Sequence, residues 1–311
     1  MISDEEIQRL AADFGLGQAL EVCRLVPGTD RAIRLTTSSG MFVLKRAHDV
    51  RHLPVLAEAA EVLTDRGLPH PRLRLGPTGQ VASDGWFAQE YLQGDAVASP
   101  TLAQTAAAMR YLGGFLAALS HLPNPGLPIS VWVELTDPIW LVENALQLAS
   151  GRGLAAEQSD AIEAATELVA ERAEQFKCLP QQLVHGDIGP DQFLWAGADV
   201  ASLVDFTPFW ESALFAVAGA LYWFDIRRGA DAAVVIDHFS LVRRWSTAER
   251  QLLPYALLRE ALRRVATPLA KPPPTDLADY LAPRVAGLQA TLAMLTQLTT
   301  SDSLGSQPDD M

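Results

Sequence analysis

The sequence has few cysteines, a shortage of basic residues and no long hydrophobic run. Its 311 residues include only two cysteines, Cys23 and Cys178, whose spacing fits neither a metal site nor a disulfide framework. Both are predicted to be free, buried thiols in a reducing compartment. Lysine and arginine number 24 against 37 aspartates and glutamates, a formal net charge of −13. This acidity argues against partners such as nucleic acid and anionic membrane surfaces.

Several sequence signals are also missing. No uncharged apolar run approaches the roughly 18 residues that a membrane-spanning helix needs. The acidic segment 1–6 lacks the apolar core of a signal peptide, so a cytoplasmic location is expected. Zinc-protease, P-loop and nucleophile-elbow motifs do not occur. Hydrophobic residues make up 49% of the chain, enough for a large core, and 311 residues predict two domains or lobes.

The N-terminal third has the pattern of a small sheet with two helices. Ser3 is a good helix N-cap, and apolar residues recur at helical spacing between residues 54 and 66. Alternating apolar residues separated by turn residues predict the strands. The predicted helices are 3–14 and 54–66, and the predicted strands are 21–25, 31–36, 41–45, 72–75 and 86–91.

The rest of the chain is mainly helical in pattern. The predicted helices are 100–121, 137–150, 156–176, 213–226, 231–244, 247–267 and 275–298. We therefore expect an α+β protein with an N-terminal lobe over 1–95 and a helical C-terminal lobe over 96–298. The polar residues 299–311 are expected to be a disordered tail.

The most informative stretch of the sequence runs from Leu183 to Phe206. Three short apolar runs are separated by a polar loop and a turn, which predicts a strand, a loop and a hairpin. This arrangement delivers Asp187, Gln192 and Asp205 to one end of the hairpin. Two carboxylates and one amide at a strand edge suit a hard cation and a catalytic base.

This pattern resembles the catalytic segment of the aminoglycoside phosphotransferase and choline kinase family, which shares the protein-kinase architecture. The family has His-Gly-Asp, four more residues, Asn, a strand and then Asp-Phe; here His185 opens the motif. The resemblance implies that Asp187 is the catalytic aspartate and that His185 braces the loop. It also implies that Asp205 and Gln192 bind the nucleotide's Mg²⁺.

The same resemblance suggests nucleotide-binding positions in the N-terminal lobe. It places Gly28 in the loop over the phosphates and Lys45 on the third strand, where it would hold them. Glu58 is our choice for the glutamate that pairs with Lys45, although Glu61 and a merely solvated helix face remain alternatives. The resemblance also implies a hinge between the lobes at about 89–94, where backbone groups near Glu90 and Leu92 would bind adenine.

Three departures from the family pattern stand out. Gln192 replaces the usual Asn, and Leu56 occupies the position that is usually the glutamate. After Asp205 the acids that brace the catalytic loop are reduced to Glu211. These departures are compatible with a divergent enzyme and also with a degenerate one.

The resemblance implies an ATP-dependent and Mg²⁺-dependent small-molecule kinase, acting as a monomer or homodimer. The alternative is a catalytically weak homologue that binds a nucleotide or a partner protein.

The acidic charge of the C-terminal part bears on the acceptor. Residues 96–311 hold 14 basic and 24 acidic residues, which favours a cationic acceptor unless these charges serve only solubility. Glu134, Asp137 and Glu143 are the acids expected near the acceptor. Tyr222 to Phe224 are expected in the core, whereas Phe209 and Trp210 could line the acceptor site.

Overall fold

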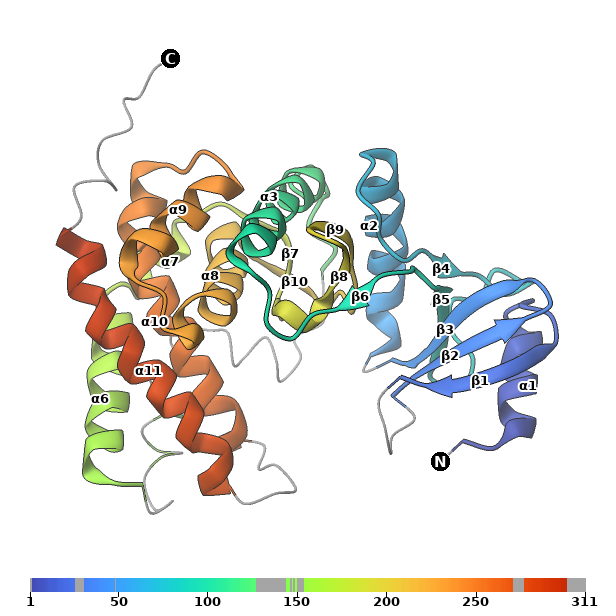
Figure 1. The fold of residues 1–311 in the computed structure, drawn as a ribbon, viewed down its shortest axis with the longest axis horizontal. Coiled ribbons are helices and arrows are strands. Elements are labelled where there is room, and N and C mark those ends of the chain that lie inside the picture. The colour runs from blue at the N-terminus through green and yellow to red at the C-terminus, as the bar shows by residue number, and fades with distance from the viewer. Residues whose placement is uncertain are drawn as a thin grey trace.

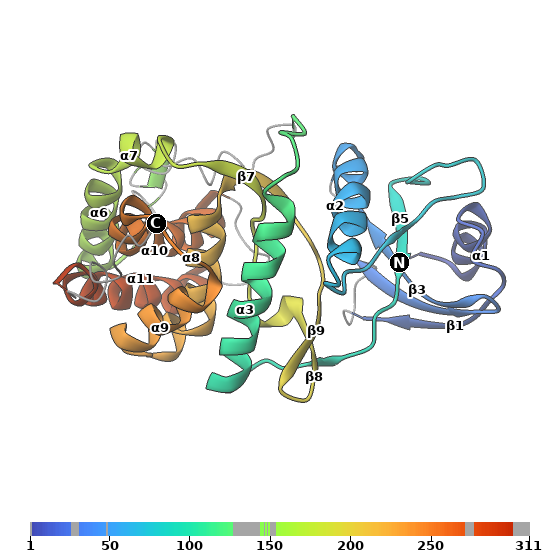
Figure 2. The same ribbon diagram turned by 90° about the horizontal axis from the view of Figure 1, so that it is seen from above.

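The computed structural model of the chain describes residues 2–25, 31–47, 49–126, 154–270 and 277–300, together with residues 144, 145, 147 and 149. A sheet lies at one end of the molecule and a group of helices at the other (Figure 1). Between them lie α2, α3 and the β8–β9 hairpin, as the view from above also shows (Figure 2). The α+β architecture predicted from the sequence is confirmed.

The N-terminal sheet has five antiparallel strands in the order β1-β2-β3-β5-β4. Its strands are β1 (Ala19–Arg24), β2 (Ala32–Thr37), β3 (Gly40–Arg46), β4 (Leu73–Arg74) and β5 (Trp86–Glu90). The inward residues of β2 and β3, such as Ile33, Leu35 and Leu44, form a separate core with α1 (Asp4–Asp13). Ser3 caps this helix by accepting a hydrogen bond from the Glu6 N–H at 3.2 Å.

Helix α2 (Leu53–Asp65) is shared between the two ends of the molecule. A 3-10 turn, η1 (Val50–His52), precedes it, and its inward residues Val55, Ala59 and Leu63 belong to the large core of the helical part. It therefore packs against α3 and not only against the sheet. The predicted boundary at residue 95 stays a prediction.

The helical part is built around α10 (Thr247–Ala270), which packs against α6, α8 and α11. Helix α8 is apolar on nearly every side, which is typical of a helix buried on all faces. A capping box between Thr101 and Gln104 begins α3. The other helices are α3 (Leu102–Leu119), α6 (Ala156–Ala170), α7 (Ala173–Lys177), α8 (Ala213–Phe224), η3 (Ile226–Arg228), α9 (Ala232–Val242) and α11 (Leu277–Thr300).

Two small sheets join the catalytic segment to the rest of the chain. One pairs β7 with β10, and the other has the order β6-β8-β9. Their bounds are β6 (Asp95–Ala96), β7 (Gln181–His185), β8 (Phe193–Ala196), β9 (Asp199–Leu203) and β10 (Pro208–Ser212), with η2 (Pro190–Gln192) before β8. Strands β6 and β10 were not predicted from the sequence, because each forms only through a partner distant in the chain.

Some sequence predictions need correction. The thiols are free, but Cys178 is exposed and Cys23 is half-buried, so the prediction that both are buried was wrong. Cys178 follows α7, where the chain lies at the surface. Most of the predicted helix over 137–150 lies outside the described residues, although residues 144, 145, 147 and 149 are described and helical. Most of the predicted tail also lies outside them, although residues 299 and 300 end α11. No helix in the described ranges has the length and hydropathy of a membrane span.

Candidate active site

The strand pairs of the catalytic segment bring its acidic residues to one place. Strand β10 runs antiparallel to β7 with Pro208 opposite His185, and the Gly186 N–H donates to the Thr207 carbonyl at 3.0 Å. The chain that has passed Asp205 therefore returns beside the loop that carries Asp187. The two aspartates interact electrostatically, since the charge of Asp187 acts on the pKa of Asp205. One end of the hairpin thus carries both predicted catalytic and metal-binding carboxylates.

Lys45 and Asp205 meet across the two ends of the molecule. The Lys45 Nζ donates to the Asp205 Oδ1 at 3.0 Å, and the charge of Lys45 lowers the pKa of that carboxyl. The lysine side chain is 14% exposed, whereas that of Asp205 is 68% exposed and open to a ligand. Asp205 has a φ of 60°, a backbone conformation that costs free energy for a residue with a Cβ and is common at functional sites.

A pocket lies around this ion pair. It encloses about 310 Å³ of empty space and is lined by Lys45, Leu56, His70, Pro71, Leu73, Phe87, Gln89, Asp205 and Phe206. Leu56 is the α2 residue that faces Lys45. Glu58 is exposed, and the structure does not bring it to Lys45. An offset of two residues turns a side chain about 200° around a helix, so Glu58 lies on the far side of α2 from Leu56.

The expected adenine-binding linker follows β5. The Glu90 carboxylate accepts from the Arg72 Nε at 3.1 Å, so this side chain belongs to the sheet edge. Leu92 lies in the extended segment after the strand, and within the described residues its N–H makes no backbone hydrogen bond. A backbone donor is therefore free where the resemblance places adenine. Gly28 lies outside the described residues.

His185 is fully buried behind the catalytic loop. Its Nδ1 accepts from the Asp187 N–H at 3.2 Å, which leaves the ring proton of the neutral imidazole on Nε2. Burial lowers the pKa of His185 to about 4 in spite of the nearby Asp187 and Asp205. The ring packs against Phe206 at a centroid distance of 5.4 Å. His185 thus links the loop of Asp187 to the residue that follows Asp205.

Gln192 is used inside the loop. Its Oε1 accepts from the Gly189 N–H at 2.6 Å, and its Nε2 donates to the Asp191 carboxylate at 3.1 Å. An amide oxygen has a second lone pair, so Gln192 can still offer one ligand to a cation. No cluster of three or more histidine, cysteine, aspartate or glutamate side chains suited to a metal occurs in the described ranges. A cation held by Asp205 and Gln192 would need most of its ligands from a substrate and water, as is usual for Mg²⁺.

The catalytic loop is held from behind by an ionic cluster on α10. The Arg264 Nη2 lies 2.9 Å from the Asp187 Oδ1, and its Nε donates to Glu260 at 2.6 Å. Glu260 also accepts two hydrogen bonds from Arg263 at 2.8 Å, and Arg263 donates to the Gly186 carbonyl at 3.3 Å. Burial would raise the pKa of Asp187, but the charges of Arg264 and Arg263 outweigh it and lower the pKa.

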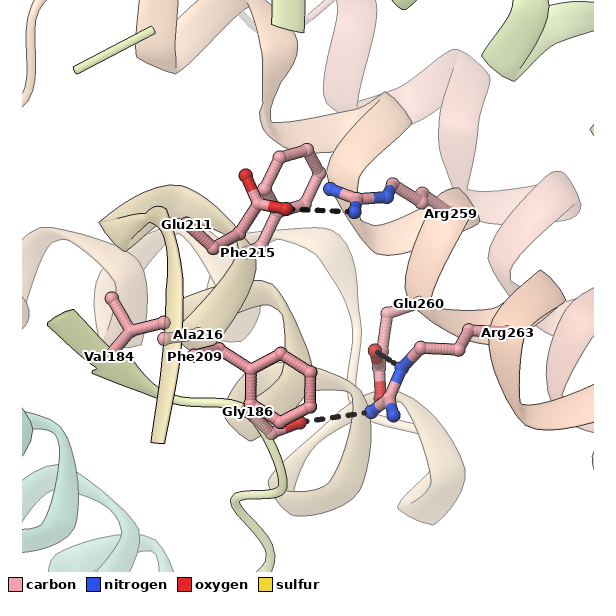
Figure 3. Close-up of a pocket in the computed structure, with 9 residues that line it drawn as sticks. All are labelled: Val184, Gly186, Phe209, Glu211, Phe215, Ala216, Arg259, Glu260 and Arg263. Carbon is pink, nitrogen blue, oxygen red and sulfur yellow. Dashed lines mark hydrogen bonds and ion pairs between the residues drawn. The ribbon is translucent and has the colours of Figure 1, made fainter. Parts of the chain in front are cut away.

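A second pocket, shown in Figure 3, lies beside this cluster and encloses about 370 Å³ of empty space. Arg259 donates to Glu211 at 3.1 Å across it, and Arg263 reaches the Gly186 carbonyl on the other side. Phe209 is buried and packs against Gly186, where an added Cβ would lie 2.0 Å from the ring. Glu211, the candidate that the family pattern leaves for the loop-bracing acid after Asp205, therefore anchors β10 to α10.

Arg263, Arg264 and Glu260 were not found by sequence reasoning. They lie more than seventy residues after Asp187, in a helix whose pattern predicts only an amphipathic surface. The one available signal was the run of charged residues between apolar ones on α10. Tyr222 and Phe224 are buried in the core as predicted, and Trp223 is half-buried and packs against that core.

The chain matches a known family over most of its length. Residues 22–253 match the model of the phosphotransferase enzyme family, APH. The chain therefore belongs to this phosphotransferase family. Among curated proteins, a homoserine kinase of Methylocella silvestris is 26% identical over 90% of this chain and 92% of that protein. A homoserine kinase of Hyphomonas neptunium is 26% identical over 91% of each.

Solved structures of related enzymes share the fold. Amicoumacin kinase hAmiN, solved with AMP-PNP, Ca²⁺ and Ami, has a TM-score of 0.69 at 14% identity over 94% of this chain and 95% of that one. A choline/ethanolamine kinase family protein from Mesorhizobium loti has a TM-score of 0.65 at 18% identity over 97% and 100%. These likenesses confirm the two-lobed, protein-kinase-like fold, and the match to the family model confirms the resemblance that the sequence predicted.

Proposed function

We propose that this chain is an ATP-dependent kinase that transfers the γ-phosphate to a hydroxyl group of a small acceptor. The main support is the 3.0 Å pair between Lys45 and Asp205, which joins the sheet to the same hairpin end that carries Asp187. A lysine from the third strand and two carboxylates from the catalytic segment are the parts that phosphoryl transfer requires. The family membership and the full-length match to the homoserine kinases agree with this reaction class.

Several residues would bind ATP and its metal ion. Lys45 would hold the α- and β-phosphates after exchanging its contact with Asp205 for them. Asp205 and the Gln192 amide oxygen would hold Mg²⁺, which supplies charge neutralisation for the phosphates. The free N–H of Leu92 and the backbone at Glu90 would hold adenine, and Gly28 would lie over the phosphates.

The acceptor side would be organised by Asp187. Its carboxylate is ionised near neutral pH because its pKa is lowered. It would orient the acceptor hydroxyl, whose oxygen forms a bond to the γ-phosphorus as the bond to the β–γ bridging oxygen breaks. ADP leaves with the electron pair of that bond, and the hydroxyl proton passes to Asp187 and then to solvent. His185, through its hydrogen bond to the Asp187 N–H, would brace this loop.

Two observations favour the alternative of a catalytically weak homologue that binds a nucleotide or a partner protein. The Gln192 oxygen already accepts from Gly189 at 2.6 Å, and Leu56 leaves Lys45 without a carboxylate from α2 in the pocket. ADP formation with a panel of acceptors separates an enzyme from a binding protein. Turnover with none of them, together with retained ATP binding, would favour this alternative.

Calorimetry with ATP in Mg²⁺ and in EDTA tests the nucleotide side. We expect tighter binding in Mg²⁺ and the loss of this difference in Asp205→Ala, because the substitution removes a metal ligand. Asp199→Ala, on the exposed turn of the same hairpin, is the matched control and should keep the difference. If the unchanged protein bound ATP with equal affinity in Mg²⁺ and in EDTA, the proposed role of the metal would be refuted.

Other features remain predictions. These are the lobe boundary at residue 95, a cytoplasmic location, and a monomer or homodimer. The cationic acceptor also stays a prediction, since Glu134, Asp137 and Glu143 lie outside the described residues. Glu58 as a partner of Lys45 would require a movement of α2.

A further inference from the structure

Three arginines from different elements lie in one region, and one of them, Arg264, contacts the catalytic loop. Arg264 comes from α10, Arg227 from η3 and Arg284 from α11. The guanidinium groups of Arg227 and Arg264 lie 4.4 and 4.9 Å from the ring centroid of Trp223. Helix α11, which carries Arg284, packs against both η3 and α10. The Arg284 guanidinium stacks on Tyr280 of the same helix at 3.5 Å. Burial and the charges of Arg227 and Arg264 lower its pKa, which agrees with three cations in one region.

Few acidic side chains of the protein balance the charges of these three arginines. Arg264 is paired with Glu260 and Asp187. Across the ranges that the structure describes, no carboxylate forms an ion pair with Arg227 or Arg284. In a chain with a net charge of −13, a local surplus of cations is conspicuous. A bound anion would offset their mutual repulsion, and guanidinium groups match the planar carboxylate well.

The cluster lies on the acceptor side of the hairpin. Arg264 touches Asp187 itself at 2.9 Å. Trp223 lies against the same loop, because a Cβ added to Gly189 would be 3.5 Å from its Cγ. The nucleotide pocket is lined by a different set of residues around Lys45, none of them from α8, α10 or α11. An anion at the arginines would therefore be part of the acceptor and not of ATP.

We propose that Arg227, Arg264 and Arg284 form a carboxylate-binding subsite, and that the acceptor is a small hydroxy acid or hydroxylated amino acid. The proposal rests on the kinase function proposed above. Arg264 can serve both Asp187 and the acceptor, since a guanidinium has five N–H donors in a plane. The face of Trp223 orients two of the guanidinium groups and excludes water from one side of the subsite.

A matched set of acceptors tests the proposal through ADP formation. Homoserine carries a hydroxyl, an amine and a carboxylate; 4-hydroxybutyrate lacks the amine, and 3-aminopropan-1-ol lacks the carboxylate. We expect kcat/KM for 3-aminopropan-1-ol to be lower than for the two carboxylates by about tenfold or more, the scale of one lost charge-assisted hydrogen bond. Choline, an aminoglycoside or a sugar phosphate turned over better than both carboxylates would overturn the subsite.

Substitutions of the arginines test where the carboxylate of the acceptor binds. Arg227→Gln is exposed and should fold normally. We expect it, and Arg284→Gln, to raise the KM for the carboxylate acceptor about tenfold while the KM for ATP and kcat stay within about twofold. Arg172→Gln is the control, since Arg172 stacks on Tyr255 at 4.6 Å in the same manner but away from Asp187. An unchanged acceptor KM in Arg227→Gln and Arg284→Gln refutes the assignment.

Direct binding separates this proposal from the kinase function. Calorimetry with 4-hydroxybutyrate and with homoserine needs no turnover. Carboxylate binding that weakens in Arg227→Gln, without ADP formation from any acceptor, would support the subsite and refute the kinase. Turnover of a neutral or cationic acceptor, with no carboxylate binding, would support the kinase and refute the subsite.

Discussion

The two sides of the catalytic hairpin are built in different ways. On the nucleotide side, Lys45 and Asp205 form one pair at 3.0 Å, and the aspartate side chain is 68% exposed. On the acceptor side, Asp187 is held by Arg264, which is itself fixed by the buried Glu260. One side is a single exchangeable contact, whereas the other is a network anchored in the core of the helical part.

This difference indicates which side must move when substrates bind. A single ion pair whose carboxylate is 68% exposed can exchange for phosphates more easily than a buried network, because water already solvates one of its partners. A buried network loses several kcal/mol when one partner is removed. We therefore expect the nucleotide side to rearrange on binding and the acceptor side to be preformed.

The largest effect is expected from Glu260→Gln. This substitution leaves Arg263 buried without its anion and Arg264 with Asp187 alone, and should lower the free energy of unfolding by about 3–5 kcal/mol. Glu174→Gln is the matched control, because Glu174 forms the same i,i+3 pair with Lys177 but is 86% exposed. Chemical denaturation measures both variants, and equal losses would show that burial of the network contributes nothing.

Asp187→Asn should lower the rate of phosphoryl transfer. The substitution keeps the shape of the side chain but removes the carboxylate that orients the hydroxyl, so kcat should fall by at least about two orders of magnitude. Steady-state kinetics on the true acceptor, with circular dichroism for the fold, measure this. Asp191→Asn, on the same loop, should keep kcat within a few-fold. A near-native rate for Asp187→Asn would make Asp187 structural and favour the binding-protein alternative.

Gly186→Ala tests how tightly the loop is packed. Its Cβ would lie 2.0 Å from the Phe209 ring, and such overpacking costs about 1–3 kcal/mol. Gly114→Ala, in the interior of α3, meets only Leu68 at 3.4 Å and should be neutral or stabilising by up to about 1 kcal/mol. Thermal unfolding compares them. A destabilised Gly114→Ala beside an unaffected Gly186→Ala would contradict the packing described here.

Acid should lower the stability of the protein first through two buried histidines and, at lower pH, through Glu260. Burial lowers the pKa of His70 to about 3 and that of His185 to about 4, so the unfolded chain binds more protons below about pH 6.5. Stability should fall by about 1 kcal/mol per pH unit for each histidine as the pH drops toward 4. The lowered pKa of Glu260 acts in the same direction, but only below about pH 4.5. His70→Phe should flatten the pH 4–6 slope in denaturant titrations; an unchanged slope would contradict this assignment.

Local sequence patterns predicted what depends on neighbours in the chain. The spacing from Asp187 to Asp205, the Ser3 cap and the alternating residues of β2 and β3 each specify a local conformation. The helices and strands of the described part follow closely from such periodicities. Lys45 was found because strand order and motif position are shared by the family that the sequence resembles.

Burial and pairing with distant partners could not be predicted in the same way. The choice between Leu56 and Glu58 depended on the rotation of α2 against the sheet, and the exposure of Cys178 depended on where α7 ends. A helical pattern shows which residues share a face, but not what that face meets. Strand β10 is a further case, since its hydrogen-bond partner is β7.

The sequence alone determined the reaction class, because the residues that handle phosphates occur in one short segment with fixed spacing. Only the tertiary structure decided what surrounds Asp187. Arg264 reaches it from 77 positions along the chain, and Arg263 on the same helix holds the Gly186 carbonyl beside it. In a sequence with 37 acidic and 24 basic residues the average charge favours a cationic acceptor, but charges act over distances of about 10 Å. The proposed arginine subsite would favour an acceptor with a carboxylate instead, and only the tertiary structure brings its residues into one region.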